Sequence, residues 1–204
     1  RICDLIRLPI PAVLRLRMQL FVDRLAAGGN ELVPMRWGLV PLWWKKPLSE
    51  LPSTFNARAE TVAAKPMFRS AFKARRCVIP ASGFYEWTGP KGAKTPHYFS
   101  APDGRPLAFA GLWERANDPE TREPMDSATI IVGPANDWMS RFHDRMPVIL
   151  DWRDADAWIT GEDPGALLRP LPEDALQEWI VSPRVNRSGV GDSDPALVKP
   201  AVAA

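Results

Sequence analysis

The stretch Phe55-Asn56-Ala57-Arg58-Ala59-Glu60 places an amide, a guanidinium and a carboxylate inside an apolar frame. Asn56 and Arg58 are two residues apart, so an extended backbone presents both side chains on the same face. Two later runs repeat the arrangement: FYEW at 84–87 holds a carboxylate between aromatic rings, and HDRMP at 143–147 holds an imidazole and a guanidinium. We expect the three runs to meet in one pocket, because these side chains together are typical of an active site.

Length and composition limit the class of protein. With 204 residues and 46% hydrophobic content, the chain can bury a core in one domain. It has no apolar run of about eighteen residues, so we expect no membrane partner, and arginine and proline interrupt residues 1–23, which argues against a secretory signal. Cys3 and Cys77 make neither a metal cluster nor a disulfide framework. We therefore expect a cytoplasmic, reduced protein with no metal and no cofactor.

The net charge of +2 hides a local asymmetry. Residues 56–76 carry six basic side chains against one acidic side chain, whereas residues 151–178 carry eight acidic against two basic. A basic block in a near-neutral chain favours a local anion site over a general polyanion binder. The alternative is a solvated helix face.

Turn and breaker residues divide the chain into short elements. Pro66 suits a first helical turn, and Asn136 suits a helix N-cap. The turn at 102–104 is expected to join 97–100 and 107–113 as a hairpin, while 173–180 fits a helix or a strand. We expect further strands at 31–40, 55–58, 77–79, 84–87, 128–132 and 147–150, and helices at 60–65, 66–75, 136–142 and 151–159.

Many turns, short strands and a few short helices favour a single α+β domain. We expect a mainly antiparallel, barrel-like sheet flanked by short helices, and the twenty-two prolines fit such a fold. Residues 31–186 are expected to form this domain, with an atypical segment at 1–30 and a polar tail at 187–204. Residues 1–27 have neither a clean helical nor a clean alternating period.

Glu86 and His143 are the sharpest candidates for chemistry. Partial burial between Tyr85 and Trp87 would raise the pKa of Glu86 and suit the carboxyl to proton transfer. The alternative is an edge-strand glutamate that points to solvent. His143 is one of two histidines, and its alternative is a hydrogen-bonded structural imidazole. We assign no role to His97.

The remaining candidates also have ordinary structural alternatives. Asn56 and Arg58 suit an anion with a polar neighbour, or are a loop amide and a surface arginine. Trp43 and Trp44, next to two lysines, suit stacking on bases of a single strand, or pack in the core. Cys77, beside Val78 and Ile79, is expected to be a buried hydrophobe.

Taken together, five ordered motifs resemble the SOS-response-associated peptidase (SRAP) family. A segment at 182–186 (SPRVN) also resembles that family's last segment, so the resemblance spans roughly residues 31–186. The five motifs are MRWGLVP at 35–41, NARAE at 56–60, GFYEW at 83–87, AGLW at 110–113 and HDRMP at 143–147.

The resemblance implies a monomeric, nucleoid-associated abasic site processing protein of the SOS response to DNA damage. Such a protein binds single-stranded DNA and forms a covalent crosslink at abasic sites. Autoproteolytic removal of the initiator methionine exposes an N-terminal cysteine, whose amine forms a Schiff base with the sugar aldehyde and whose thiol closes a thiazolidine. Peptidase and lyase-type activity are thereby implied.

The motif match also implies roles for individual residues. Asn56 would orient the cysteine or the sugar, Glu86 would transfer protons, and His143 would assist the imine chemistry. Arg58 and Arg145 would bind the phosphates of the DNA backbone. The DNA path would be lined by Trp43, Trp44 and Trp87.

The first residues depart from the family pattern. The chain opens Arg1-Ile2-Cys3-Asp4, whereas the family opens with methionine and then cysteine. Because the Cys3 nitrogen is part of a peptide bond, Cys3 closes a thiazolidine only after Arg1 and Ile2 are removed. We expect residues 1 to about 24 to be a truncated, misread or diverged start.

Two other functions compete with a covalent trap for abasic DNA. One is a non-covalent single-strand binder that uses the arginines and tryptophans without a nucleophile. The other is a cysteine peptidase acting on other proteins, which requires a cysteine in contact with a histidine.

Overall fold

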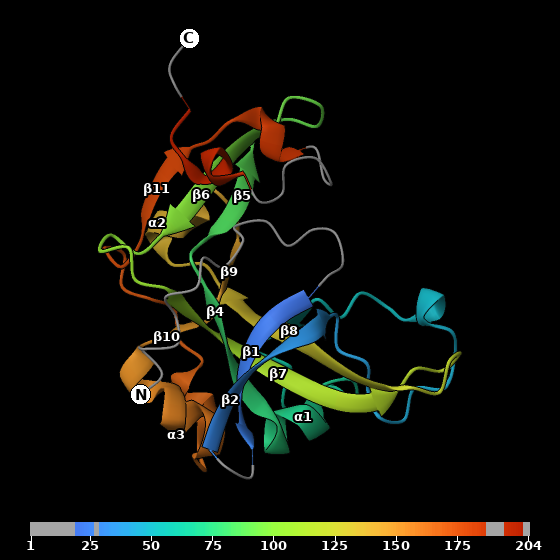
Figure 1. Ribbon diagram of the computed structural model, residues 1–204. Helices are drawn as coiled ribbons and strands as arrows, with labels where there is room; N and C mark the ends of the chain where they lie inside the picture. The colour runs from blue at the N-terminus through green and yellow to red at the C-terminus, as the bar shows by residue number, and fades with distance from the viewer. Residues whose placement is uncertain (1–18, 27–28, 187–193, 202–204) are drawn as a thin grey trace.

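The computed structural model describes residues 19–26, 29–186 and 194–201, which form two sheets with short helices around them (Figure 1). Five strands of the larger sheet close into a barrel in the order β4-β1-β2-β8-β7, because β7 also pairs with β4. Only the β2–β8 pair in this ring is parallel. The barrel strands are β1 (Gln19–Ala26), β2 (Gly29–Trp37), β4 (Arg76–Ala81), β7 (Leu107–Asn117) and β8 (Pro124–Pro134).

Three short strands extend the barrel along β7 and β8. The strand β3 (Asn56–Arg58) pairs with one edge of β8 in parallel, and β9 (Arg145–Pro147) pairs with β8 antiparallel. Both reach the same point, since Arg58 and Pro147 are each registered with Val132. The strand β10 (Ile149–Leu150) continues from β9 and pairs with β7.

The second sheet is antiparallel, in the order β11-β6-β5. Figure 1 shows it above the barrel, with β9 between the two sheets and α1 and α3 at the opposite end. Its strands are β5 (Phe84–Thr88), β6 (Thr95–Ser100) and β11 (Gln177–Ile180).

The helices are short, and polar caps hold several of them. Asn136 caps α2 by accepting a hydrogen bond from the Met139 amide at 2.8 Å. The α-helices are α1 (Arg69–Ala74), α2 (Asp137–Ser140) and α3 (Ala155–Thr160), and the 3₁₀ segments are η2 (Leu48–Glu50), η3 (Trp152–Asp154), η4 (Pro164–Leu167), η5 (Pro183–Asn186) and η6 (Pro195–Val198).

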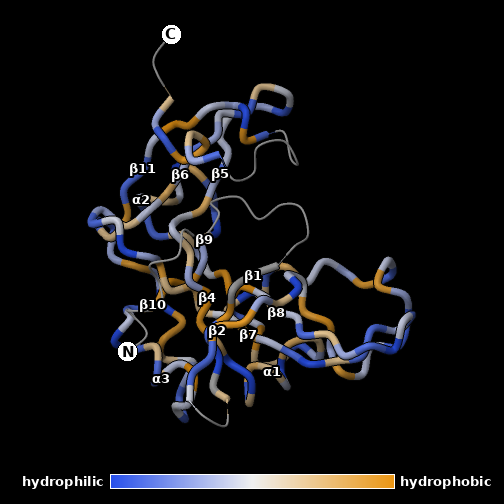
Figure 2. The backbone as a smooth tube through the Cα atoms, viewed as in Figure 1, coloured by the Kyte–Doolittle hydropathy of each residue, from blue (hydrophilic) through white to orange (hydrophobic). Residues whose placement is uncertain are grey.

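The core follows the strands of the barrel. Figure 2 shows that hydrophobic residues are concentrated where the barrel strands meet and that hydrophilic residues lie on the outer loops. β4 is buried along almost its whole length, including Cys77, as predicted for that residue. Opposite Cys77 lies Gly111, where a Cβ would come within 2.6 Å of Ile79 and 3.0 Å of the Cys77 Sγ. The glycine of the AGLW motif therefore allows β7 to approach β4.

The fold class is confirmed as α+β with a barrel-like, mainly antiparallel sheet, and three local predictions are wrong. The strands predicted at 97–100 and 107–113 exist, but they belong to different sheets and form no hairpin. Residues 60–65 form turns instead of a helix, and 147–150 contains two strands separated at Val148. The ambiguous run 173–180 contains a strand, β11.

Asp23 is a buried acid in β1, 5% exposed, and its Oδ2 atom has no hydrogen-bond partner. Burial and the charge of Asp156 raise its pKa to about 6, against a hydrogen bond from Asn30 that lowers it. The folded state therefore holds this proton more tightly than the unfolded state, whose pKa is 3.8. Its contribution to stability is full below pH 3.8 and is lost as the pH rises through 6.

Replacing Asp23 with Asn is expected to raise the free energy of unfolding at pH 8 by about 1–3 kcal/mol, because the variant removes a buried charge. The gain should fade toward pH 4. Urea unfolding of both proteins at pH 4, 6 and 8 measures it. An equal difference at all three pH values would contradict the assigned cause.

Candidate functional site

Glu86 lies in the middle of β5, the outer strand of the small sheet, and is partly buried. Burial raises its pKa, the neighbouring His143 and the Trp87 backbone lower it, and Asp144 raises it. The net direction is upward. A carboxyl with this environment holds a proton closer to neutral pH than an exposed glutamate does, which suits it to general acid–base work.

The chain can approach β6 closely at the start of β5 because residue 83 is glycine. A Cβ at Gly83 would lie 2.2 Å from the Phe99 carbonyl oxygen and 2.5 Å from the Tyr98 ring. No other residue fits this approach without moving backbone. The glycine of the GFYEW motif thus sets the position from which Glu86 projects.

His143 follows α2 and is exposed, with 45% of its side chain accessible. Its amide donates to the Met139 carbonyl at 3.1 Å, which fixes the turn. Its Nδ1 accepts from the Arg145 amide at 2.9 Å and lies 3.1 Å from an Asp144 carboxylate oxygen. A neutral ring that accepts at Nδ1 carries its proton on Nε2. His143 is close enough to Glu86 for its charge to lower the pKa of that carboxyl.

Arg145 and Glu60 form an ion pair across β8. The Arg145 Nη1 lies 2.5 Å from the Glu60 Oε1. A backbone hydrogen bond at Glu60, the contact with Arg145 and the charge of Arg58 together lower the pKa of Glu60. Asn56 and Arg58 are exposed while Ala57 between them is buried. The same-face geometry that the spacing predicts is therefore present in β3.

These contacts join the three sequence runs. The charge of His143 lowers the pKa of Glu86, and the His143 ring accepts a hydrogen bond from the Arg145 backbone. The Arg145 side chain pairs with Glu60, whose pKa is also lowered by the charge of Arg58. Asn56 is linked to this group only because it lies on β3 together with Arg58. Among the described residues, its side chain makes no contact with Glu86. Glu60 and Asp144 are the two charged members that sequence analysis did not single out, although both lie inside the quoted motifs.

The tryptophans are less closely tied to this group. Trp43 and Trp44 lie in the loop before β3, with their rings 6.0 Å apart. Trp43 is 53% exposed, and the Trp44 Nε1 is buried without a hydrogen-bond partner. Trp87 donates from Nε1 to the Asn186 Oδ1 at 2.7 Å and, by strand alternation, leaves β5 on the face opposite to Glu86.

The basic block divides into two kinds of residue. Arg75 pairs with Glu114 at 2.7 Å, and Arg76 is buried against backbone carbonyls. Arg58 and Arg69 are exposed. The anion site expected from the charge count is therefore restricted to the exposed members of the block.

A thiol is not part of the described site. Cys77 is fully buried, and burial raises the pKa of its thiol well above 9.0. A protonated, inaccessible thiol is a poor nucleophile, so the cysteine peptidase alternative has no support from Cys77. Cys3 lies outside the described residues.

The described residues contain neither a cluster of metal ligands nor a membrane-spanning helix. Within that part of the chain, no three His, Cys, Asp or Glu side chains are grouped so as to hold a metal ion. No described helix is long and apolar enough to cross a membrane.

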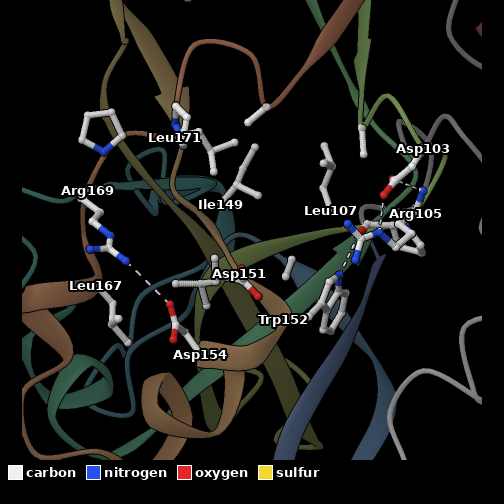
Figure 3. Close-up of a pocket in the computed structure, with 17 residues that line it drawn as sticks. Asp103, Arg105, Leu107, Ile149, Asp151, Trp152, Asp154, Leu167, Arg169 and Leu171 are labelled. Atoms are coloured by element: carbon white, nitrogen blue, oxygen red, sulfur yellow. Dashed lines mark hydrogen bonds and ion pairs between the residues drawn. The ribbon is translucent and has the colours of Figure 1, made fainter.

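A separate pocket of about 370 Å³ lies between β10, η4 and the loop after β6 (Figure 3). Leu107, Ile149 and Leu171 supply apolar walls, and Arg105 and Arg169 lie at its rim with acidic neighbours. None of the predicted site residues lines it.

Fold and site together define an α+β barrel protein in which a partly buried carboxyl and an imidazole lie near an arginine-containing ion pair. The chain belongs to the SOS response associated peptidase (SRAP) family, whose pattern matches residues 10–188.

Relatives and solved structures agree with this assignment. The chain is 40% identical over 166 residues to the abasic site processing protein YoqW of Bacillus subtilis, covering 78% of this chain and 73% of that one. It is 35% identical over 181 residues to the abasic site processing protein HMCES of Xenopus tropicalis, covering 77% and 54%. A crystal structure of a Bacteroides thetaiotaomicron protein superposes with a TM-score of 0.81 at 25% identity, covering 90% and 82%. A Bordetella bronchiseptica protein gives 0.73 at 32% identity, covering 81% and 85%.

Proposed function

We propose that this protein processes abasic sites in single-stranded DNA and forms a covalent crosslink there. The relatives named as abasic site processing proteins support the substrate class. The observation that carries the proposal is the Glu86–His143 pair beside Arg145 and Arg58. An aldehyde lesion flanked by phosphates requires both proton transfer and cationic side chains.

In the proposed reaction, a cysteine amine attacks the sugar aldehyde, and loss of water gives an imine. The thiol then adds to the imine carbon and its proton moves to nitrogen, which closes a thiazolidine. Glu86 would donate the proton that opens the sugar ring and releases water, and His143 would take up and return protons at nitrogen. Asn56 would orient the sugar or the cysteine. Autoproteolytic and lyase-type steps would use the same pair.

Mass spectrometry of the full chain incubated with an abasic oligonucleotide tests the proposal. We expect an adduct equal to protein plus DNA minus one water, mapped to a cysteine with a free amine, such as Cys3 after removal of Arg1 and Ile2. An oligonucleotide with a reduced, aldehyde-free abasic site is the matched control and should give no adduct. Binding to both oligonucleotides with no adduct to either would identify a non-covalent single-strand binder instead.

Arg58 and Arg145 should each contribute to DNA binding through one phosphate. We expect Arg58→Ala and Arg145→Ala each to reduce the slope of log K against log salt concentration by about 0.7. Fluorescence anisotropy with a single-stranded oligonucleotide at several salt concentrations measures this slope. Arg153→Ala, next to α3 and at the far end of the molecule from β5 in Figure 1, is the matched control. An equal loss of slope in the control would show that the effect is only net charge.

Arg145 must leave Glu60 to reach a phosphate, or share its guanidinium with both. Glu60→Gln should therefore strengthen single-strand binding by about two- to fivefold at low salt, since a competing carboxylate is removed. The same titrations measure it. Weaker binding in this variant would show instead that Glu60 holds Arg145 in its binding position.

A further inference from the structure

A buried hydroxyl–imidazole–carboxylate chain crosses the small sheet. His97 in β6 is 8% exposed. Its Nδ1 lies 2.5 Å from the Glu178 Oε1 in β11, and its Nε2 lies 2.8 Å from the Thr88 Oγ1 in β5. The imidazole therefore links all three strands of the sheet shown at the top of Figure 1.

These partners determine the tautomer of the neutral ring and leave it no free nitrogen. An ionised Glu178 only accepts hydrogen bonds, so Nδ1 donates to it. In the neutral ring Nε2 then accepts from the Thr88 hydroxyl. Because both nitrogens are occupied, His97 cannot itself exchange protons with a substrate while these bonds last. Any effect on the reaction must pass through its neighbours.

Those neighbours include Glu86 and the residue that directly precedes His143. His97 is the cross-strand partner of Glu86 in the β5–β6 register. Its ring also meets the Phe142 ring edge-on, with 5.0 Å between centroids, and Phe142 directly precedes His143. The imidazole is thus in contact with the segment that carries His143 and is registered opposite the strand position that carries Glu86.

A second contact strengthens the link to the His143 segment. Phe142 also meets Phe99, two residues along β6, with 5.0 Å between centroids. Phe99 is fully buried, so Phe142 is seated on a rigid strand surface formed by His97 and Phe99. Because its ring is held by packing on both sides, Phe142 limits how far the segment that carries His143 can move.

We propose that His97, locked by Thr88 and Glu178, is a positioning residue that keeps Glu86 and His143 next to each other. The geometric part is independent of the reaction; the catalytic consequence rests on the proposed function. The titratable groups around His97 and its two hydrogen-bond partners are Glu86, His143, Asp144 and Glu178. Each of these groups must be considered when the effect of His97 on the Glu86–His143 interaction is measured.

The test is a double-mutant cycle on the Glu86–His143 interaction. The pKa of Glu86 is followed by NMR of ¹³C-labelled glutamate carboxyls, with its signal assigned by its absence in Glu86→Gln. His143→Gln should raise that pKa, because His143 lowers it in the native protein. In a His97→Phe background, which keeps an aromatic ring under Phe142 but removes both hydrogen bonds, the effect of His143→Gln should shrink to less than about a third.

Two further variants separate positioning from general damage. Glu178→Leu removes the acceptor of the His97 Nδ1 hydrogen bond, so it should also reduce the effect of His143→Gln; it decides the question if His97→Phe does not fold. Tyr98→Phe is the control, because this neighbour leaves β6 on the opposite face. It should leave the interaction unchanged. An interaction of native size in both His97→Phe and Glu178→Leu, or in whichever of them folds, overturns the proposal.

The rate of adduct formation supplies the functional readout. We expect His97→Phe to slow it by about tenfold with unchanged affinity for single-stranded DNA. If the native protein forms no adduct and the cycle still shows the dependence on His97, the proposed function fails while the positioning role stands. If adducts form normally and the cycle shows no dependence on His97, the positioning role fails while the proposed function stands.

Discussion

Replacing Glu86 with Gln is expected to slow covalent adduct formation with abasic DNA by at least about 100-fold, because the amide cannot donate or accept the proton at neutral pH. The substitution keeps the size and planarity of the side chain, and β5 has no other carboxylate. Affinity for single-stranded DNA should stay within about twofold, since Glu86 contributes no positive charge. Single-turnover kinetics on denaturing gels measure the rate, and anisotropy measures the affinity.

Glu173→Gln serves as the control, because this exposed glutamate lies before β11, outside the three motifs. Its adduct rate should equal that of the native protein. The pH profile adds a second criterion: the native rate should report a group with the raised pKa of Glu86, and Glu86→Gln should lack that inflection. A profile that is identical in both proteins would remove Glu86 from the chemistry.

Replacing Arg76 with Ala should have the largest effect on stability, lowering the free energy of unfolding by about 3–5 kcal/mol. The guanidinium is 7% exposed and donates to the carbonyls of Trp158 at 2.5 Å and Gly161 at 2.7 Å. It also donates to carbonyls at the end of α1, at Phe72 and Lys73. The substitution leaves four helix-end carbonyls without this donor and opens a cavity beside β4.

Arg69→Ala is the comparison, as this arginine of the same basic block is exposed on α1. It should change the free energy of unfolding by less than about 0.5 kcal/mol. Urea denaturation of both variants measures the difference. Equal stability of the two would mean that α1 and α3 are held to β4 by their apolar faces alone.

Local chemistry predicted many elements because it acts over a few residues. The Asn136 cap, the β5 strand after Gly83 and the alternation of Asn56 and Arg58 all depend on neighbours in the chain. The turn at 102–104 also forms, since the Gly104 amide bonds to the Ala101 carbonyl at 3.0 Å. What the turn does not determine is the partner of each strand, so the predicted hairpin was wrong.

The candidate site could be predicted only in part. Its residues were found because the motifs contain unusual combinations of charge and aromatic rings. The Glu60–Arg145 ion pair was not predicted, because it joins residues 85 positions apart across β8. Nor was a role for His97 predicted: its three contacts come from Thr88, Phe142 and Glu178, and no local pattern relates them. Charge counting placed Arg75 and Arg76 with the anion site. In the structure both stabilise the fold instead, because Arg75 pairs with Glu114 and Arg76 is buried against backbone carbonyls.

The position of β8 between β2, β3, β7 and β9 bears on how the protein is made. On a ribosome, β1, β2 and β3 emerge first, yet β2 and β3 find their parallel neighbour only at residues 127–132. The nascent chain must therefore keep these early strands apart from other chains while about 70 more residues are translated, since such distant pairings form slowly. Arg58 and Glu60 receive their place relative to Arg145 at the end of this process. A chain arrested before β8 is complete should consequently lack the proposed DNA site and depend on chaperones to remain free of aggregates.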